Sequence, residues 1–247
     1  MVVGGYEGGM TPPPCIPSYA GYRFPAEVIS YAVYLYFRFP LSLRMVEEML
    51  AVRGIEVSHE TVRKWGLKFG REIANGIHRR RPQGGVKWHL DEMVVTIAGT
   101  KHYLWRAVDQ DGFVLEALVQ SRRDKKAAKR LLRKLLKKQA RAPRVMVTDK
   151  LRSYGAAKKE IMSGVEHRQH KGLNNRAENS HQPTLRRERQ MKRFKSARHV
   201  QRFVSIHDPI ANLFHFPRNQ LTAADYRAAR AQAFEDWAEI AGARLAA

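Results

Sequence analysis

Residues 86–120, VKWHLDEMVVTIAGTKHYLWRAVDQDGFVLEALVQ, decide the fold of this chain. Three runs rich in β-branched and aromatic residues predict strands over 86–97, 102–108 and 113–120. Gly99 ends the first run, and the polar run Asp-Gln-Asp-Gly at 109–112 predicts the turn between the second and the third. The stretch is therefore expected to form three strands in a hairpin series.

The residues that follow predict helices that alternate with strands. A helix opening at Asp124 would place Leu131 and Leu135 inward and lysines and arginines on its outer face. After it come a strand over 144–148, a helix over 153–162, a short strand over 165–169 and a long helical stretch to about Phe214. Pro183 predicts a kink or a fresh helix start within that stretch. This order predicts an α/β fold with helices flanking a mixed sheet, which is the element order of the ribonuclease H-like fold.

Residues 24–78 predict a small all-α helix-turn-helix module that binds DNA. A first helix stops before Pro40, and Ser42 and Ser58 are suited to cap the two helices that follow. The last helix would bury one apolar face and present a basic outer face, as the recognition helix of such a module does. The candidate DNA contacts on it are His59, Arg63, Lys64 and Lys68. An ordinary helical hairpin is the alternative.

The remaining boundaries follow from composition. Residues 1–23 hold three consecutive prolines and predict a flexible N-terminal arm. Residues 79–85 predict a basic linker, in which Arg79, Arg80 and Arg81 are candidate phosphate contacts. The ribonuclease H-like domain is expected over 86–216, and a C-terminal helical tail over 217–247.

The charge of the chain points to a polyanionic partner. The 247 residues carry 45 Lys and Arg against 23 Asp and Glu, a net charge of +22, and residues 121–200 supply +20 of it. Such a block attracts nucleic acid, although a solvated surface kept for solubility would look similar. The single cysteine excludes a disulfide framework. The longest apolar run, residues 28–37, is too short to cross a bilayer, and no secretory signal is visible, so we expect a cytoplasmic protein without membrane contact.

Three acids predict a catalytic metal site. Asp91 lies inside the first strand, Asp149 ends the strand over 144–148, and Glu178 opens the last helical stretch. These positions converge in a ribonuclease H-like arrangement and could hold two divalent cations about 3.5–4 Å apart. Oxygen ligands in a basic setting suit Mg²⁺, with Mn²⁺ able to substitute. The alternative is that these acids cap helices or pair with arginines.

A second group of basic residues lies close to this site in the sequence. Lys150 follows Asp149 directly and is a candidate phosphate contact. The cluster of Arg186, Arg187, Lys192 and Arg193 is either the open face of a helix or a track for DNA.

Several ordered motifs resemble one family of bacterial proteins. They are WHLDE at 88–92, RAVD at 106–109, SRR at 121–123, TDK at 148–150, EHRQ at 166–169, NNRAEN at 174–179 and FKS at 194–196. Together they resemble the DDE transposases of the IS-six family of insertion sequences. Residues 38–50 and 57–65 look like the helix-turn-helix of the same family, so the resemblance covers residues 24–220 or so.

The resemblance implies an enzyme that binds short terminal inverted repeats, cleaves DNA ends to 3′-hydroxyls and joins them to target DNA. It implies a homodimer or higher homo-oligomer on double-stranded DNA, associated with the nucleoid when it acts. It also implies that Asp91, Asp149 and Glu178 are the catalytic and metal-binding residues. The 57 residues between the two aspartates are ordinary for the family, whereas the 28 between Asp149 and Glu178 are fewer than expected. A helix-turn-helix regulator without catalysis and a ribonuclease H-like nuclease without specificity for transposon ends remain the alternatives.

Overall fold

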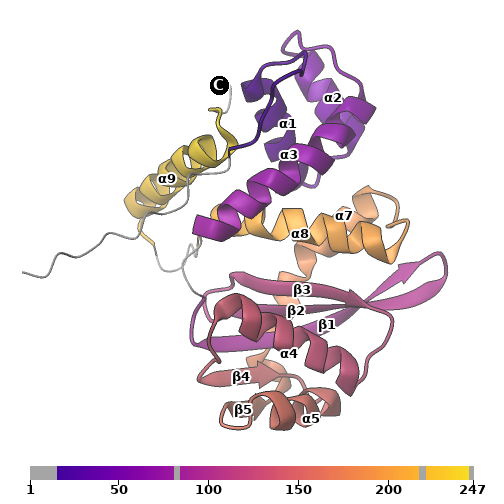
Figure 1. Cartoon of the computed structure of the whole chain (residues 1–247), viewed down its shortest axis with the longest axis vertical. Helices are drawn as coiled ribbons and strands as arrows, with labels where there is room; N and C mark the ends of the chain where they lie inside the picture. The colour runs from indigo at the N-terminus through magenta and orange to yellow at the C-terminus, as the bar shows by residue number, and fades with distance from the viewer. Residues whose placement is uncertain (1–15, 81–83, 217–220, 245–247) are drawn as a thin grey trace, which may run out of the picture.

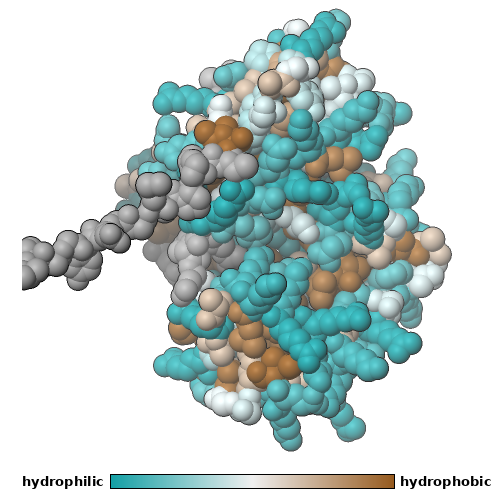
Figure 2. Space-filling model, viewed as in Figure 1, coloured by the Kyte–Doolittle hydropathy of each residue, from teal (hydrophilic) through white to brown (hydrophobic). Residues whose placement is uncertain are grey.

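The computed structural model describes residues 16–80, 84–216 and 221–244. Most of the predicted arm and Arg81 therefore lie outside the described residues. Figure 1 shows a helical part at one end, a sheet covered by two helices at the other, and helix α8 (Ala197–Leu213) between them. Figure 2 shows that the face in this view is mostly hydrophilic, with hydrophobic patches between charged side chains.

The sheet has the predicted mixed architecture. Its strands are β1 (Lys87–Ile97), β2 (Thr100–Asp109), β3 (Val114–Gln120), β4 (Val145–Thr148) and β5 (Glu166–Gln169). They lie in the order β3-β2-β1-β4-β5. The pairs β1–β2 and β2–β3 are antiparallel, whereas β1–β4 and β4–β5 are parallel. This arrangement confirms the predicted α/β fold with a ribonuclease H-like order of elements.

Helices α4 (Lys125–Gln139) and α5 (Arg152–Ile161) cover one face of the sheet. Leu131, Leu132 and Leu135 of α4 pack with Trp88 and Trp105 of the strands in one buried cluster. The Asp124 side chain caps α4 by accepting from the Ala127 N–H at 2.8 Å. The amphipathic pattern read from the sequence therefore sets both the start of α4 and the face that it buries.

The N-terminal helices are α1 (Ala26–Arg38), α2 (Leu43–Ala51) and α3 (His59–Arg80). Ser42 and Ser58 accept hydrogen bonds from the Met45 and Thr61 N–H groups, as N-caps do. Helix α3 runs further than expected, and Arg79 and Arg80 of the predicted linker are helical. The reason is that its apolar spacing continues through Ile73 and Ile77, which are buried.

The helical part does not have a core of its own. Buried residues of α1, α2 and α3 form one cluster with residues of α8, α9 (Ala223–Ala241) and the strands. Trp237 of α9 is fully buried and donates to the Ser30 hydroxyl of α1 at 2.8 Å. The predicted C-terminal helix is thus present and is packed against α1 and α3. Within the three described ranges, no helix is long and apolar enough to cross a membrane.

The long helical stretch after β5 is divided into separate pieces. A 3-10 turn (Lys171–Leu173) precedes α6 (Asn175–Ser180), α7 (Gln182–Gln190) and α8. Pro183 lies in the first turn of α7, so the expected fresh helix start is confirmed. Lys192 and Arg193 have φ angles of 51° and 78°, which separate α7 from α8.

Candidate functional site

Three carboxylates meet where β1 and β4 lie side by side. One oxygen each of Asp91, Glu92 and Asp149 lies within 4.8 Å of the others. The two aspartates are neighbours because Leu90 pairs with Thr148 in the parallel register, and each aspartate is the next residue along. The structure therefore brings together two of the three predicted acids and adds Glu92.

Glu92 is the site residue that sequence reasoning missed. Alternation along β1 gives the side chains of Asp91 and Glu92 opposite faces of the sheet, yet the Glu92 carboxylate still reaches the end of β4. Its side chain is 1% exposed, and Oε2 has no hydrogen-bond partner among the described residues. Burial raises the pKa of Glu92, although contacts with Tyr154 and Arg123 oppose this. The sequence feature that could have identified Glu92 is its position as a second acid directly after Asp91 within a predicted strand.

Arg123 links two of these carboxylates. Its Nη2 lies 2.5 Å from Glu92 Oε1 and 3.7 Å from Asp149 Oδ2. Arg123 belongs to the SRR run just after β3, so the end of that strand delivers a positive charge to the acidic cluster. The guanidinium offsets part of the repulsion among the three acids.

Glu178 is exposed on α6, outside the group of three carboxylates. The helix is attached to the sheet on both sides of this residue. Before it, Asn174 Nδ2 donates to the Leu90 carbonyl at 2.8 Å in a buried setting. After it, His181 Nε2 lies 3.3 Å from Asp91 Oδ2. The contacts at both ends of α6 therefore keep Glu178 on a helix that packs against the strand of Asp91.

Arg106 reinforces the same junction. It lies opposite Asp91 on β2, is 1% exposed, and pairs with Asp208 of α8 at 3.2 Å. The guanidinium also donates to the Ser180 carbonyl and, at 3.0 Å, to the Thr184 hydroxyl. Burial lowers the pKa of His181 despite the nearby Asp91, so at neutral pH the imidazole contacts Asp91 without a charge.

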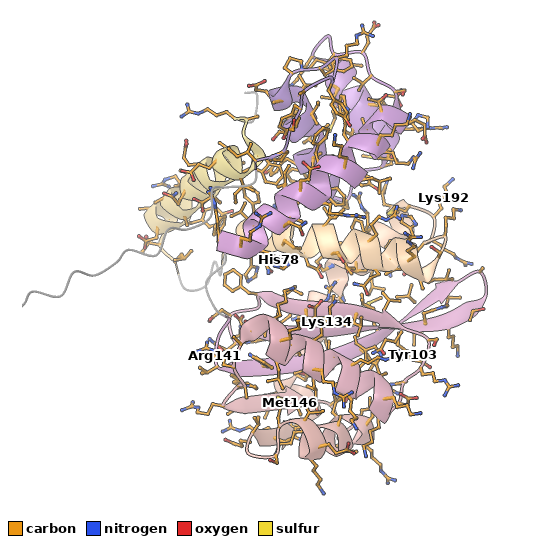
Figure 3. All side chains as sticks on the ribbon, viewed as in Figure 1. His78, Tyr103, Lys134, Arg141, Met146 and Lys192 are labelled. Carbon is orange, nitrogen blue, oxygen red and sulfur yellow. The ribbon has the colours of Figure 1, made fainter. Side chains whose placement is uncertain are left out.

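The predicted DNA contacts differ in how open they are. Lys64, Lys68, Arg79, Lys150, Arg186, Lys192 and Arg193 are exposed. Lys192 lies at the outer edge of the molecule beyond α7 (Figure 3). His59 lies 3.3 Å from Glu47, Arg63 2.8 Å from Glu60, and Arg80 2.5 Å from Glu239. These three contacts are partly exposed surface pairs. His59, Arg63 and Arg80 can therefore leave their acidic partners and contact DNA instead.

The structure contradicts the prediction that Arg187 contacts DNA. It is 2% exposed and donates to the backbone carbonyls of Tyr36 and Leu41. Its guanidinium lies 4.0 Å from the centre of the Tyr36 ring. A phosphate cannot reach a cation that is enclosed in this way, so Arg187 attaches α7 to α1 instead.

Replacement of Arg187 should therefore affect stability. Arg187→Gln is expected to lower the free energy of unfolding by about 2 to 4 kcal/mol, because charged hydrogen bonds to buried carbonyls are lost. The neighbouring exposed Arg186 is the matched control, and Arg186→Gln should change stability by less than about 0.5 kcal/mol. Urea unfolding of both variants measures the difference. Equal stabilities would show that the buried contacts of Arg187 contribute nothing.

The donor set of the acidic cluster suits a hard cation. All of its ligand atoms are carboxylate oxygens, and the buried Glu92 Oε2 lacks any partner within the described ranges. Oxygen ligands are what Mg²⁺, Mn²⁺ and Ca²⁺ prefer in proteins. The residues present therefore fit a divalent metal ion.

The sheet has the ribonuclease H-like strand order, with Asp91 on the central strand β1 and Asp149 directly after the adjacent β4. The family model of the DDE domain matches residues 85–216, so the protein is a DDE polynucleotidyl transferase. The transposase for the insertion sequence-like element IS431mec of Staphylococcus aureus (strain Mu50) is 30% identical over 164 residues, covering 64% of this chain and 73% of that protein. The transposase of insertion sequence IS257 in transposon Tn4003 of the same species matches with the same identity and coverage. The chain belongs to the IS-six family of DDE transposases.

One solved structure is also similar in part. It is the intasome of simian T-cell lymphotropic virus in complex with PP2A regulatory subunit B56 gamma. The similarity covers 56% of this chain and 51% of that chain, with 14% identity and a TM-score of 0.37. Its membership of the transposase family makes the protein an enzyme of DNA transposition, which acts on DNA and uses divalent metal ions as its family does.

Proposed function

We propose that this transposase recognises the terminal inverted repeats of an insertion sequence and that Asp91, Asp149 and Glu178 hold two Mg²⁺ ions for cleavage and strand transfer. The observation that carries the proposal is the meeting of Asp91 and Asp149 at the β1–β4 junction, with the helix of Glu178 attached beside Asp91. A regulator that only binds DNA would gain nothing from clustering acids that repel its ligand. The acidic cluster therefore favours catalysis.

The residues of the chain have distinct parts in this chemistry. Bound divalent ions would orient a water or a DNA 3′-hydroxyl and stabilise in-line attack on a phosphodiester. Asp91 and Asp149 supply negative oxygen ligands, and the uncharged His181 holds the Asp91 side chain in place. Glu178 completes the ligand set from α6. Lys150, which is exposed directly after Asp149, would contact a phosphate of the DNA backbone.

The proposal is tested by an assay of cleavage and strand transfer on DNA with the repeats that flank the gene. Purified protein should cut repeat-bearing DNA to 3′-hydroxyl ends with Mg²⁺ or Mn²⁺ and not after chelation with EDTA. Scrambled ends should be cut much less. Equal cutting of both substrates would support the nuclease without end specificity, and binding without any cutting would support the regulator.

Recognition of the repeat is proposed to lie in residues 42–72. The exposed side of α3 carries Arg63 and Lys64, which would reach bases or phosphates in the major groove. Arg63→Ala or Lys64→Ala should weaken binding to the cognate repeat by about 1–3 kcal/mol and binding to random DNA by less. Gel-shift titrations on repeat and scrambled duplexes measure this. Equal weakening on both probes would make these residues phosphate contacts without a role in recognition.

The proposal includes assembly on DNA and a place in the cell. An insertion sequence has two ends, so joining both to a target calls for two active sites in a homodimer or higher homo-oligomer. Light scattering of the protein with and without repeat DNA measures the number of copies. We also propose that the protein acts in the cytoplasm, on the DNA of the nucleoid.

A further inference from the structure

A groove lies between the helical part of the molecule and its sheet. It encloses about 630 Å³ and is lined by residues of α3, α8 and β3. Helix α8 lies between α3 and β3, so it forms the floor, and the other two elements form the sides (Figure 1). Three arginines line the groove: Arg71 from α3 and Arg198 and Arg202 from α8.

None of these three arginines has an acidic partner in the part of the chain that the structure describes. On helix α4, by comparison, four of the eight lysines and arginines have an acidic partner. Lys134 (Figure 3) and Lys138 lie 3.0 and 3.3 Å from the Glu116 carboxylate, and Lys125 and Lys129 pair with Glu160. The groove therefore concentrates uncompensated positive charge at a hollow in the surface, which attracts a polyanion.

The groove continues the exposed side of α3. Lys64, Lys68, Arg71 and Asn75 are all exposed and are spaced by four, three and four residues. Side chains at this spacing lie on one face of a helix. A polar stripe thus runs from the part of α3 proposed to read DNA to the two groove-lining residues Arg71 and Asn75.

The floor of the groove is fixed to the sheet. Gln201 of α8 accepts from the Val119 N–H at 2.8 Å and donates to the Ala117 carbonyl at 3.1 Å, so both ends of its amide bind the edge of β3. Asn212 binds the N–H and carbonyl of Val114 in the same way, at 2.9 and 2.8 Å. Arg198 and Arg202 lie on the same helix and are therefore held at a fixed position relative to the strands.

A short stretch of chain connects the groove with the acidic cluster. Val119 lines the groove, and Arg123, only four residues further along the chain, contacts Glu92 and Asp149. Four residues span at most about 14 Å. A ligand held in the groove is consequently close to the carboxylates that carry out the chemistry.

We propose that the groove formed by Arg71, Arg198 and Arg202 binds the sugar-phosphate backbone of double-stranded DNA between the recognition helix α3 and the active site. This inference rests on the proposed function, because it gives the path of the DNA between the two sites. The contacts are to phosphate, so they contribute affinity and position without sequence preference.

The test is the salt dependence of duplex binding by a triple variant, Arg71→Gln, Arg198→Gln and Arg202→Gln. The probe is a linear duplex of arbitrary sequence, and its Kd is measured between 50 and 200 mM salt. Loss of three phosphate contacts should reduce the slope of log K against log[salt] by about 2.7, since each contact contributes about 0.9. The affinity of the variant should then fall about 40-fold less than that of the wild type across this range.

A control triple removes the same charge elsewhere: Lys137→Gln, Lys159→Gln and Arg227→Gln, all exposed, on α4, α5 and α9. Its slope should stay close to that of the wild type. The triple with lysine at the three groove positions should also keep the slope, which separates charge from packing. Equal slopes for the groove and control triples would overturn the proposal, as would a loss confined to single-stranded probes. The binding assay does not depend on metal-dependent cleavage, so a negative result for the groove would leave the proposed catalysis unaffected.

Discussion

Asp91→Asn and Asp149→Asn are each expected to abolish strand transfer, with a fall in rate of about 100- to 1000-fold or more. Each change removes a negative oxygen ligand at almost unchanged shape. Stabilisation of the transition state by a bound divalent ion is worth several kcal/mol, and about 1.4 kcal/mol corresponds to a tenfold change in rate. The measurement is single-turnover joining of repeat-bearing DNA in Mg²⁺.

Both variants should stay folded and continue to bind DNA. The Asp149 carboxylate accepts from the Leu151 N–H at 3.0 Å, and the amide oxygen of asparagine can accept the same bond. Asp91 contacts His181, which an asparagine can also do. If both variants bind DNA in gel shifts as the wild type does but no longer join it, the two aspartates act in the chemical step. Full joining activity in either variant would remove that residue from the site.

Much of the catalytic fold could be predicted because it depends on local patterns. The apolar runs and turn residues of 86–120 predict three strands that the structure confirms to within a few residues. The parallel pairing of the two predicted strands then suffices to bring Asp91 next to Asp149. Here local sequence and simple topology determine the position of the functional residues.

The rest could not be predicted because it depends on contacts between distant parts of the chain. Arg187 lies among other arginines in the sequence, and only the approach of α1 buries it. Trp237 and Ser30 are 207 residues apart, so no local pattern predicts that α9 joins the core of the N-terminal helices. Glu92 is missed for a related reason, since strand alternation predicts a side chain directed away from Asp91.

The third carboxylate of the catalytic site has still to be identified, and three glutamates are candidates for it. Between Asp149 and Glu188 there are 38 residues, more than the 28 before Glu178, but Glu188 is on α7 directly beside Arg187, which is attached to α1. Glu92 is already close to both aspartates, but Arg123 occupies its Oε1. Glu178 is the exposed acid on the helix that Asn174 and His181 attach to β1. Within the described part of the chain, the Glu178 carboxylate has no ion pair, and this favours Glu178 as the third ligand.

Glu178→Gln is therefore expected to reduce metal-dependent strand transfer by about 100-fold or more, whereas Glu188→Gln should retain most of the activity. Glutamine keeps the length and shape of each side chain and one acceptor oxygen, so both variants should bind repeat DNA as the wild type does. Glu92→Gln adds a third comparison, because it removes the charge that Arg123 balances and leaves α6 untouched. Joining assays in Mg²⁺ and in Mn²⁺ separate the three residues. If Glu178→Gln stays active, the third ligand is the glutamate whose variant loses strand transfer, and the contacts that attach α6 to β1 have a purely structural purpose.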